Sequence, residues 1–233
     1  MPGASLSLTE YITEIRYKPN AKVLDYRGTW AEKIKALTEL PRWRITENRV
    51  DVFTDDDTAR AFVSFKNAGF VLQDSPTRNY FPDQTNKLFR FLFQQEAFGS
   101  SVTVPRIGVR FRCAISFDGS FEDLLERYTD RLLAITPQAQ QAFGGKTVDI
   151  GGSVNMTTPL GKINTTSGPM EEKQLKQFFP NRKAVPTAAL YLDMDYYKEP
   201  NSEMISREII SSVRLFSESL WDIKDNLVQL VLS

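Results

Sequence analysis

Two aspartates in one short segment are the residues whose type and spacing most directly suggest chemistry. Asp193 and Asp195 alternate with apolar residues within Leu190–Tyr196, a pattern that predicts a β-strand. Side chains two positions apart share one face of a strand, so both carboxylates should lie together. Such a pair can hold Mg²⁺ or Mn²⁺ for phosphoryl chemistry, with Asp149 as the one further acid on another predicted strand nearby. Asp193 and Asp195 are therefore the candidate metal ligands.

A structural interpretation of the same two aspartates needs no metal. The segment Arg106–Phe117 also alternates, and its polar face carries Arg110 and Arg112. If the two strands are neighbours, the aspartates lie opposite these arginines, and cross-strand charge pairs of this kind are ordinary in sheets. Both interpretations stay open here. Arg110 and Arg112 are also candidate binding residues.

A second kind of binding signal is an aromatic residue flanked by basic ones. Arg42-Trp43-Arg44 and Phe178–Lys183 both interleave aromatic and basic side chains. Base stacking combined with phosphate pairing binds single-stranded nucleic acid in this way. A junction between a helix and a strand, with one buried aromatic and solvated charges, gives the same pattern. Trp43 is the third candidate binding residue.

The chain contains no histidine and a single cysteine, Cys113. This composition excludes Ser-His-Asp and Cys-His catalysis, histidine-ligated or four-cysteine zinc, and an intrachain disulfide. Cys113 falls on the apolar face of its predicted strand, so we expect an inert core thiol. Gly144–Thr147 resembles the end of a phosphate-binding loop, but Gln140 replaces the required first glycine and the strand-to-helix context is missing. No cofactor is expected.

The overall composition is that of a folded, charge-balanced protein. Its 233 residues are 41% hydrophobic and 12% aromatic, with 29 basic and 29 acidic residues. A nucleic-acid-binding protein usually has a basic excess, which is absent here. The first residues lack the features of a signal peptide, and no apolar run approaches the roughly 18 residues of a membrane span. We therefore expect a cytoplasmic protein without membrane contacts.

The first hundred residues predict a strand, a helix, three strands and a closing helix. The helix begins at a capping box of Thr29 and Glu32 and stops before Pro41. The expected strands are Tyr11–Lys18, Trp43–Phe53, Ala61–Lys66 and Gly69–Gln73, and the closing helix is Asp83–Phe98.

The remaining residues repeat this order. After the strand Arg106–Phe117, Ser120 and Asp123 form a capping box for a second helix. The later elements are a hairpin within Gly144–Gly168 that turns at Thr158–Gly161, a short helix Glu171–Phe179, a strand Ala188–Tyr197 and a long helix over residues 202–232.

The matching order predicts an internal duplication. Gly28–Glu32 aligns with Gly119–Asp123, and Ile34 then falls on Leu125. We predict an α+β fold with a mainly antiparallel sheet built from two related β-α-β-β(-β)-α halves, backed by helices. The halves are residues 1–100 and 101–233, forming one compact unit that the long C-terminal helix closes.

Three segments carry a resemblance to a known family. They are Glu14–Pro19, Arg106–Arg112, and Leu192–Tyr196 followed by a long helix with Leu215-Phe216. Together they are similar to a sporadically distributed bacterial protein family of unknown function. Thr9-Glu10-Tyr11 departs from that family's proline-rich start. The family supplies no catalytic residues, and its patchy distribution implies accessory genes such as those of phage defence and toxin immunity.

Three hypotheses about function follow. The first is a non-enzymatic binding or regulatory protein with a protein partner, serving as an accessory component of a bacterial defence or toxin-immunity system. Its basis is the missing catalytic machinery, balanced charge and aromatic content. The second is a Mg²⁺- or Mn²⁺-dependent enzyme acting on phosphodiesters or nucleotides through Asp193 and Asp195. The third is a saddle-shaped sheet that grips nucleic acid or a peptide.

Overall fold

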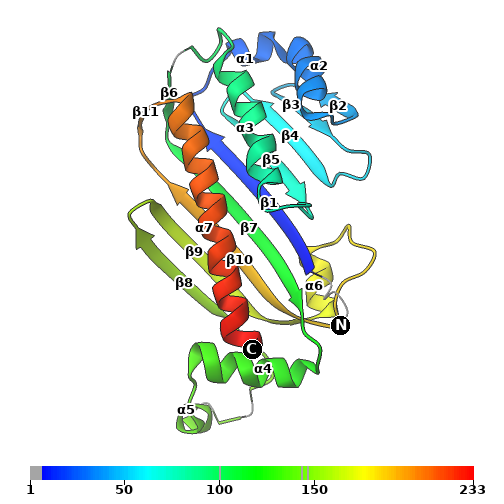
Figure 1. Cartoon of the computed structure of the whole chain (residues 1–233), viewed down its shortest axis with the longest axis vertical. Helices are drawn as coiled ribbons and strands as arrows, with labels where there is room; N and C mark the ends of the chain where they lie inside the picture. Colours follow the sequence, from blue (N-terminus) through cyan, green and yellow to red (C-terminus); the bar gives the residue numbers. More distant parts are fainter. Residues whose placement is uncertain (1–6, 100, 143, 146) are drawn as a thin grey trace.

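The computed structural model describes residues 7–99, 101–142, 144–145 and 147–233, and these residues build one large antiparallel sheet. The sheet has nine strands (Figure 1). From edge to edge they are β2 (Arg42–Ile45), β3 (Arg49–Phe53), β4 (Ala59–Ser64), β5 (Asn67–Gln73), β1 (Ser7–Arg16), β7 (Arg106–Ser116), β10 (Ala188–Lys198), β9 (Gly161–Glu171) and β8 (Gly152–Thr158). A small second sheet pairs β6 (Ser101–Val104) with β11 (Ser202–Ile205).

One face of the large sheet carries most of the helices. α7 (Ser206–Leu232) crosses β7 and β10 and packs beside α3 (Tyr80–Phe93), as Figure 1 shows. α2 (Arg27–Thr38) covers β2 and β3, while α4 (Phe121–Tyr128) covers β9 and β10. The shorter helical segments are α1 (Lys22–Asp25), η1 (Thr129–Leu133), α5 (Pro137–Ala142) and α6 (Glu172–Phe178).

Strict alternation in the central strands places the core on the α7 side. In β7, Ile107, Val109, Phe111 and Cys113 are fully buried beneath the helices, and the arginines between them face the other way. α7 meets this surface with Phe216, whose ring stacks on Tyr196 of β10 at a centroid distance of 4.5 Å. The predicted α+β class, antiparallel sheet and long C-terminal helix are thus confirmed.

The opposite side of the sheet, here called the polar face, is covered at one end only. There α6 packs Leu175 and the following Phe179 onto Leu8, Ala114 and Tyr191, from β1, β7 and β10. The rest of this side carries the charged residues of the strands.

Two details of the first half differ from the predictions. Trp43–Phe53 is a hairpin of two strands, β2 and β3, because the polar run Thr46–Asn48 turns the chain. The capping box of Thr29 and Glu32 is wrong: α2 begins at Arg27, so Thr29 lies inside the helix and Tyr26 precedes it without a side-chain cap.

The second half follows its predictions more closely. Ser120 and Asp123 form the expected capping box, with each side chain bonded to the backbone N–H of the other residue. The hairpin turns at Thr158–Gly161, where the Thr158 hydroxyl accepts hydrogen bonds from the N–H groups of Leu160 and Gly161. The terminal helix begins at Ser206 because Ser202–Ile205 extends to pair with β6.

The two halves of the chain meet at β1 and β7. The first half contributes β2 to β5 and β1, and the second contributes β7 to β10. The element order departs from the predicted β-α-β-β(-β)-α halves: the first half has four strands between α2 and α3, and in the second α6 lies between β9 and β10. An origin by duplication stays a prediction. No helix in the described part of the chain is both long and apolar enough to cross a bilayer.

Candidate functional site

The sequence-predicted aspartates and arginines do come together, at the centre of the polar face. The strand register places Asp193 directly opposite Arg112 and Asp195 directly opposite Arg110. The ion pairs, however, run diagonally: Arg110 donates to both carboxylate oxygens of Asp193, with its Nε 2.7 Å from Oδ1. Long side chains reach such diagonal neighbours across a sheet. The expected charge pairing between β7 and β10 is therefore present, but Asp193 pairs with Arg110 and not with Arg112, which lies directly opposite it.

The other two ion pairs on the polar face each involve a residue that was not a candidate from the sequence: one is an arginine and the other an acid. Arg106 donates to Asp195 at 2.6 Å, and Arg112 is paired with Glu10 of β1. Glu10 lies between Arg112 and Gln73 of the neighbouring strands, so only the sheet order identifies it as a partner. These six residues, Glu10, Arg106, Arg110, Arg112, Asp193 and Asp195, form what we call the ion-pair network.

Two residues of the ion-pair network have shifted pKa values, each for a different physical reason. The hydrogen bonds that Arg110 donates to Asp193 raise the pKa of Arg110, so this guanidinium stays charged. Burial raises the pKa of Asp195 above its ordinary value, although Arg106 opposes the shift. Asp195 therefore holds its proton to higher pH in the folded than in the unfolded chain. Its contribution to stability is greatest below the unfolded pKa and is lost as the pH rises through the folded one.

Metal binding by Asp193 and Asp195 would have to compete with these arginines. Among the residues that the structure describes, no three acidic or cysteine side chains gather in an arrangement that could hold a metal ion. Asp149, the further acid considered from the sequence, instead accepts a hydrogen bond from Gln174 of α6. The structural interpretation therefore accounts for the ion pairs of both aspartates, and Asp193 also accepts a hydrogen bond from the hydroxyl of Tyr191.

Two glycines lie on the polar face outside the ion-pair network. Gly69 and Gly108 lie on either side of Glu14 in the sheet register. A Cβ on Gly69 would lie 2.0 Å from the carbonyl oxygen of Thr13 and 2.6 Å from the ring of Phe62, and one on Gly108 would lie 2.9 Å from Cβ of Tyr197. Backbone and aromatic atoms thus occupy the space that a larger residue would need.

An arginine covers each of these two rings. Arg49 lies 4.3 Å from the centroid of Phe62, and Arg106 lies 4.2 Å from the centroid of Tyr197. Cation–π contacts of this kind hold the guanidinium groups in place. Most charged side chains named on the polar face thus already contact an opposite charge or an aromatic ring, although Nε of Arg112 is buried without a hydrogen-bond partner.

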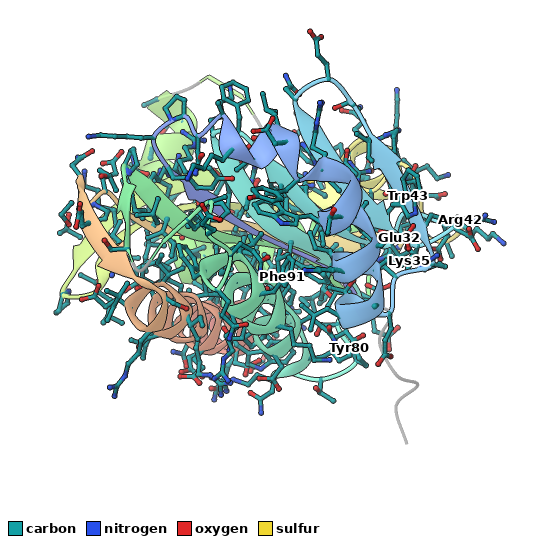
Figure 2. All side chains as sticks on the ribbon, turned by 90° about the horizontal axis from the view of Figure 1, so that it is seen from above. Glu32, Lys35, Arg42, Trp43, Tyr80 and Phe91 are labelled. Atoms are coloured by element: carbon teal, nitrogen blue, oxygen red, sulfur yellow. The ribbon has the colours of Figure 1, made fainter. Side chains whose placement is uncertain are left out.

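Trp43 lies apart from Arg110 and Arg112, at the β2 edge of the sheet and on its helical side. Its partner in β3 is the buried Val52, yet Trp43 itself is 45% exposed and Ile45 is 37% exposed. Figure 2 shows Arg42 and Trp43 at the margin of the molecule, on the side where α2 carries Glu32 and Lys35. We call Arg42–Ile45 the β2 surface. The three sequence-predicted binding residues therefore do not form one site.

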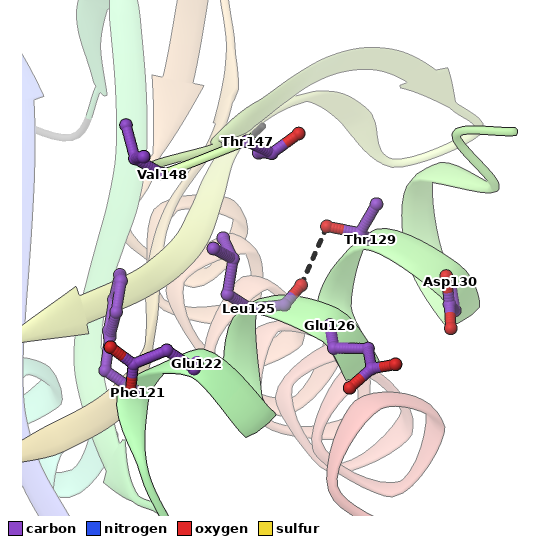
Figure 3. Close-up of a pocket in the computed structure, with 8 residues that line it drawn as sticks. All are labelled: Phe121, Glu122, Leu125, Glu126, Thr129, Asp130, Thr147 and Val148. Carbon is purple, nitrogen blue, oxygen red and sulfur yellow. Dashed lines mark hydrogen bonds between the residues drawn. The ribbon is translucent and has the colours of Figure 1, made fainter. Parts of the chain in front are cut away.

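A groove beside α4 was not anticipated from the sequence. Its volume is about 460 Å³. Figure 3 shows Glu122, Glu126 and Asp130 along one side of the helix, with Thr147 and the exposed Val148 across from them. The hydroxyl of Thr129 bonds to the carbonyl of Leu125 where α4 passes into the π-helical turn η1. The three acids follow the helix at intervals of four residues and do not converge on one point.

Cys113 is fully buried in β7, as the sequence predicts, and burial raises the pKa of its thiol to about 12. Because the thiolate is the reactive form, we expect no reaction with a disulfide reagent in the native protein at pH 8. One thiol should react at once after unfolding in urea. Absorbance of the released reagent measures both; rapid labelling of the folded protein would contradict the buried position.

The fold and these surfaces define an α+β protein that carries a nine-stranded antiparallel sheet with one helical face and one ion-paired face. A scan against family models and a search of curated proteins gave no match to the chain.

Proposed function

We propose that this protein is a non-enzymatic binding protein that contacts a protein partner through the β2 surface. The observation that carries this proposal is the exposure of Trp43. Of the three tryptophans in the chain, Trp30 is buried and Trp221 packs partly buried against the core, whereas Trp43 projects from an edge strand. Tryptophan and arginine dominate the binding energy of many protein interfaces, and Trp43 lies in β2 between Arg42 and Arg44, which extend from the other face of the strand.

The neighbours of Trp43 also suit a protein partner better than a nucleic acid. Arg42 is hydrogen-bonded to Asp55 at 2.5 Å, and Arg44 lies 3.7 Å from Asp51 while its guanidinium sits over Phe53. Guanidinium groups with acidic neighbours offer less to a phosphate backbone. The arginines point to the polar face of β2, whereas Trp43 and Ile45 form an exposed apolar patch on its helical side.

A role as an accessory component of a bacterial defence or toxin-immunity system is part of this proposal. It rests on the resemblance to the sporadically distributed bacterial family alone. An immunity or regulatory protein acts by binding another protein, which is consistent with a recognition surface around Trp43.

The test is retention of a partner by wild-type protein and by Trp43→Ala, followed by calorimetry with the purified partner. A hot-spot residue contributes about 2 kcal/mol or more, so we expect binding to weaken by at least about 30-fold. Leu230→Ala is the matched control, because Leu230 is 47% exposed on α7, far along the chain from β2. A partner that binds Trp43→Ala as tightly as wild type would overturn the proposal, as would a native lysate that yields none.

The alternative hypotheses keep their own tests. Magnesium or manganese calorimetry that shows heat lost in Asp193→Asn would support the metal-dependent enzyme. DNA binding with a steep salt dependence would support the nucleic-acid saddle. Because acids already pair with the arginines of the polar face, we favour neither over the binding protein.

A further inference from the structure

The two edges of the large sheet differ in how well they are protected against pairing with another strand. The β2 edge is short and carries Arg42 and Arg44 directly after Pro41. β8, at the other edge, has seven residues with neither a charge nor a proline, and no strand in the described part of the chain pairs with its outer side. Short length, charges and proline are the usual protections of an edge strand, so β8 is the unprotected edge.

β8 is nevertheless held firmly in an extended conformation. It pairs with β9 along its whole length, from Gly152 opposite Ser167 to Thr158 opposite Gly161. Tyr128 of α4 fixes this hairpin from the helical side by bonding to the carbonyl and the hydroxyl of Ser167 at 2.8 Å. A preformed strand loses little conformational entropy when another strand pairs with it.

The exposed side chains of β8 are apolar on one face and small and polar on the other. Val154 is 53% exposed and Met156 is 43% exposed on the helical side, where no helix lies over β8 in Figure 1. Ser153, Asn155 and Thr157 occupy the polar face, in register with Thr166, Asn164 and Lys162 of β9. Both faces are thus open beside the free edge.

We infer that β8 pairs antiparallel with β8 of a second copy of this chain. A two-fold axis at Asn155 would place Val154 of each copy opposite Met156 of the other, and Ser153 opposite Thr157. Every cross-strand pair then matches in polarity, and the two exposed apolar residues cover each other. Both large sheets would join into one continuous sheet with an isologous interface.

The charges favour a second copy over a foreign strand. No like charges meet when β8 faces itself, because the strand contains none, and the whole chain has a formal net charge of zero. Foreign strands commonly carry charges that would find no counterpart along β8. Self-pairing is also independent of the proposed function, because Trp43 lies at the opposite edge of the sheet.

Sedimentation velocity across a concentration series measures the association, starting from a monomer of 26.6 kDa. We expect a concentration-dependent dimer in the wild type. Val154→Lys and Met156→Glu should each weaken it by at least about tenfold, because a charge would replace half of each apolar pair. The double variant should regain the dimer, since each lysine then faces the glutamate of the other copy. Circular dichroism confirms that the variants remain folded.

Crosslinking tests the register itself. Asn155→Cys places two thiols opposite each other at the axis, within the range of Cα separations that a disulfide spans, so oxidation should give a covalent dimer. Thr157→Cys is the matched control: its two copies would be four residues apart along the strands, and no crosslink should form. The native Cys113 is buried and stays silent.

Several results would overturn the inference that β8 pairs with β8 of a second copy. A wild-type chain that is monomeric at all concentrations overturns the inference. So does a dimer that Val154→Lys and Met156→Glu leave intact, or one in which Asn155→Cys gives no covalent dimer. Capture of another protein's strand by a monomeric chain would also overturn it. Trp43→Ala should leave self-association unchanged, so failure here is distinguishable from failure of the proposed function.

Discussion

Phe216→Ala should lower the free energy of unfolding by about 3–5 kcal/mol, the range found for removing a buried phenylalanine ring. Phe216 is 1% exposed and stacks on Tyr196, so it links α7 to β10 in the second half of the sheet. Removing the ring leaves a cavity between the helix and the strand that the rigid sheet cannot fill. Equilibrium unfolding in urea measures the change.

Leu215→Ala is the matched control for this prediction. Leu215 is the preceding residue of the same helix, but it is 39% exposed. Its truncation should change the free energy of unfolding by less than about 1 kcal/mol, mostly through lost partial packing. Equal effects of the two substitutions would mean that α7 does not present this face to the sheet.

Arg112→Met should lower the free energy of unfolding by about 3–5 kcal/mol, because it leaves the carboxylate of Glu10 without its ionic partner. The side chains of Arg112 and Glu10 are 21% and 11% exposed, so water compensates little for the lost partner. The double variant Glu10→Leu/Arg112→Met removes both charges. It should be more stable than Arg112→Met alone, because no unpaired charge remains beneath the neighbouring side chains.

Arg42→Ala serves as the exposed counterpart. Arg42 pairs with Asp55, and both side chains are about two-thirds exposed, at 66% and 68%. Pairs of this kind contribute about 0–1 kcal/mol because water screens them. Urea unfolding measures the change in the free energy of unfolding for the buried pair and for the exposed pair. If the effects of Glu10→Leu and Arg112→Met simply add in the double variant, the two charges do not stabilise each other.

The contrast between these two pairs shows why charged residues in one sheet can have different roles. The pair of Arg112 and Glu10 lies on the central strands, where its low exposure makes breaking it costly. The β2 surface lies at an edge, where its ion pairs can open at small cost to admit a partner. Exposure of Trp43 beside such pairs is therefore compatible with a stable fold and an available binding surface.

The two edges of the sheet also divide the proposed interactions. Arginines on β2 protect that edge from pairing with another strand, so recognition there would use side chains. β8 lacks such protection, so its backbone would form the contact. One chain could then bind a second copy of itself at β8 and a different protein at β2 without competition between them.

Much of the fold could be predicted from local patterns. Period-two alternation in Arg106–Phe117 and Ala188–Tyr197 located β7 and β10, because polar and apolar residues alternate through Arg106–Arg112 and Leu192–Tyr196. Ser120 and Asp123 located the start of α4, because a capping box satisfies backbone N–H groups within four residues. Such signals depend on neighbours in sequence and need no knowledge of the sheet.

The Thr29 capping box shows where local reasoning fails. Thr29 and Glu32 have the right spacing, but α2 begins at Arg27, so the motif lies inside the helix. The hairpin between β2 and β3 was likewise missed, because its turn, Thr46–Asn48, is short and contains neither glycine nor proline.

By itself, the sequence determined the α+β class, the order of most elements, the lack of histidine chemistry and the common face of Asp193 and Asp195. Only the tertiary structure decided which arginine each aspartate meets, that Glu10 completes the network, and that Trp43 and β8 lie at opposite edges. The physical reason is that alternation fixes which way a side chain points, whereas strand order and register fix what it meets, and these depend on contacts between residues far apart in the chain.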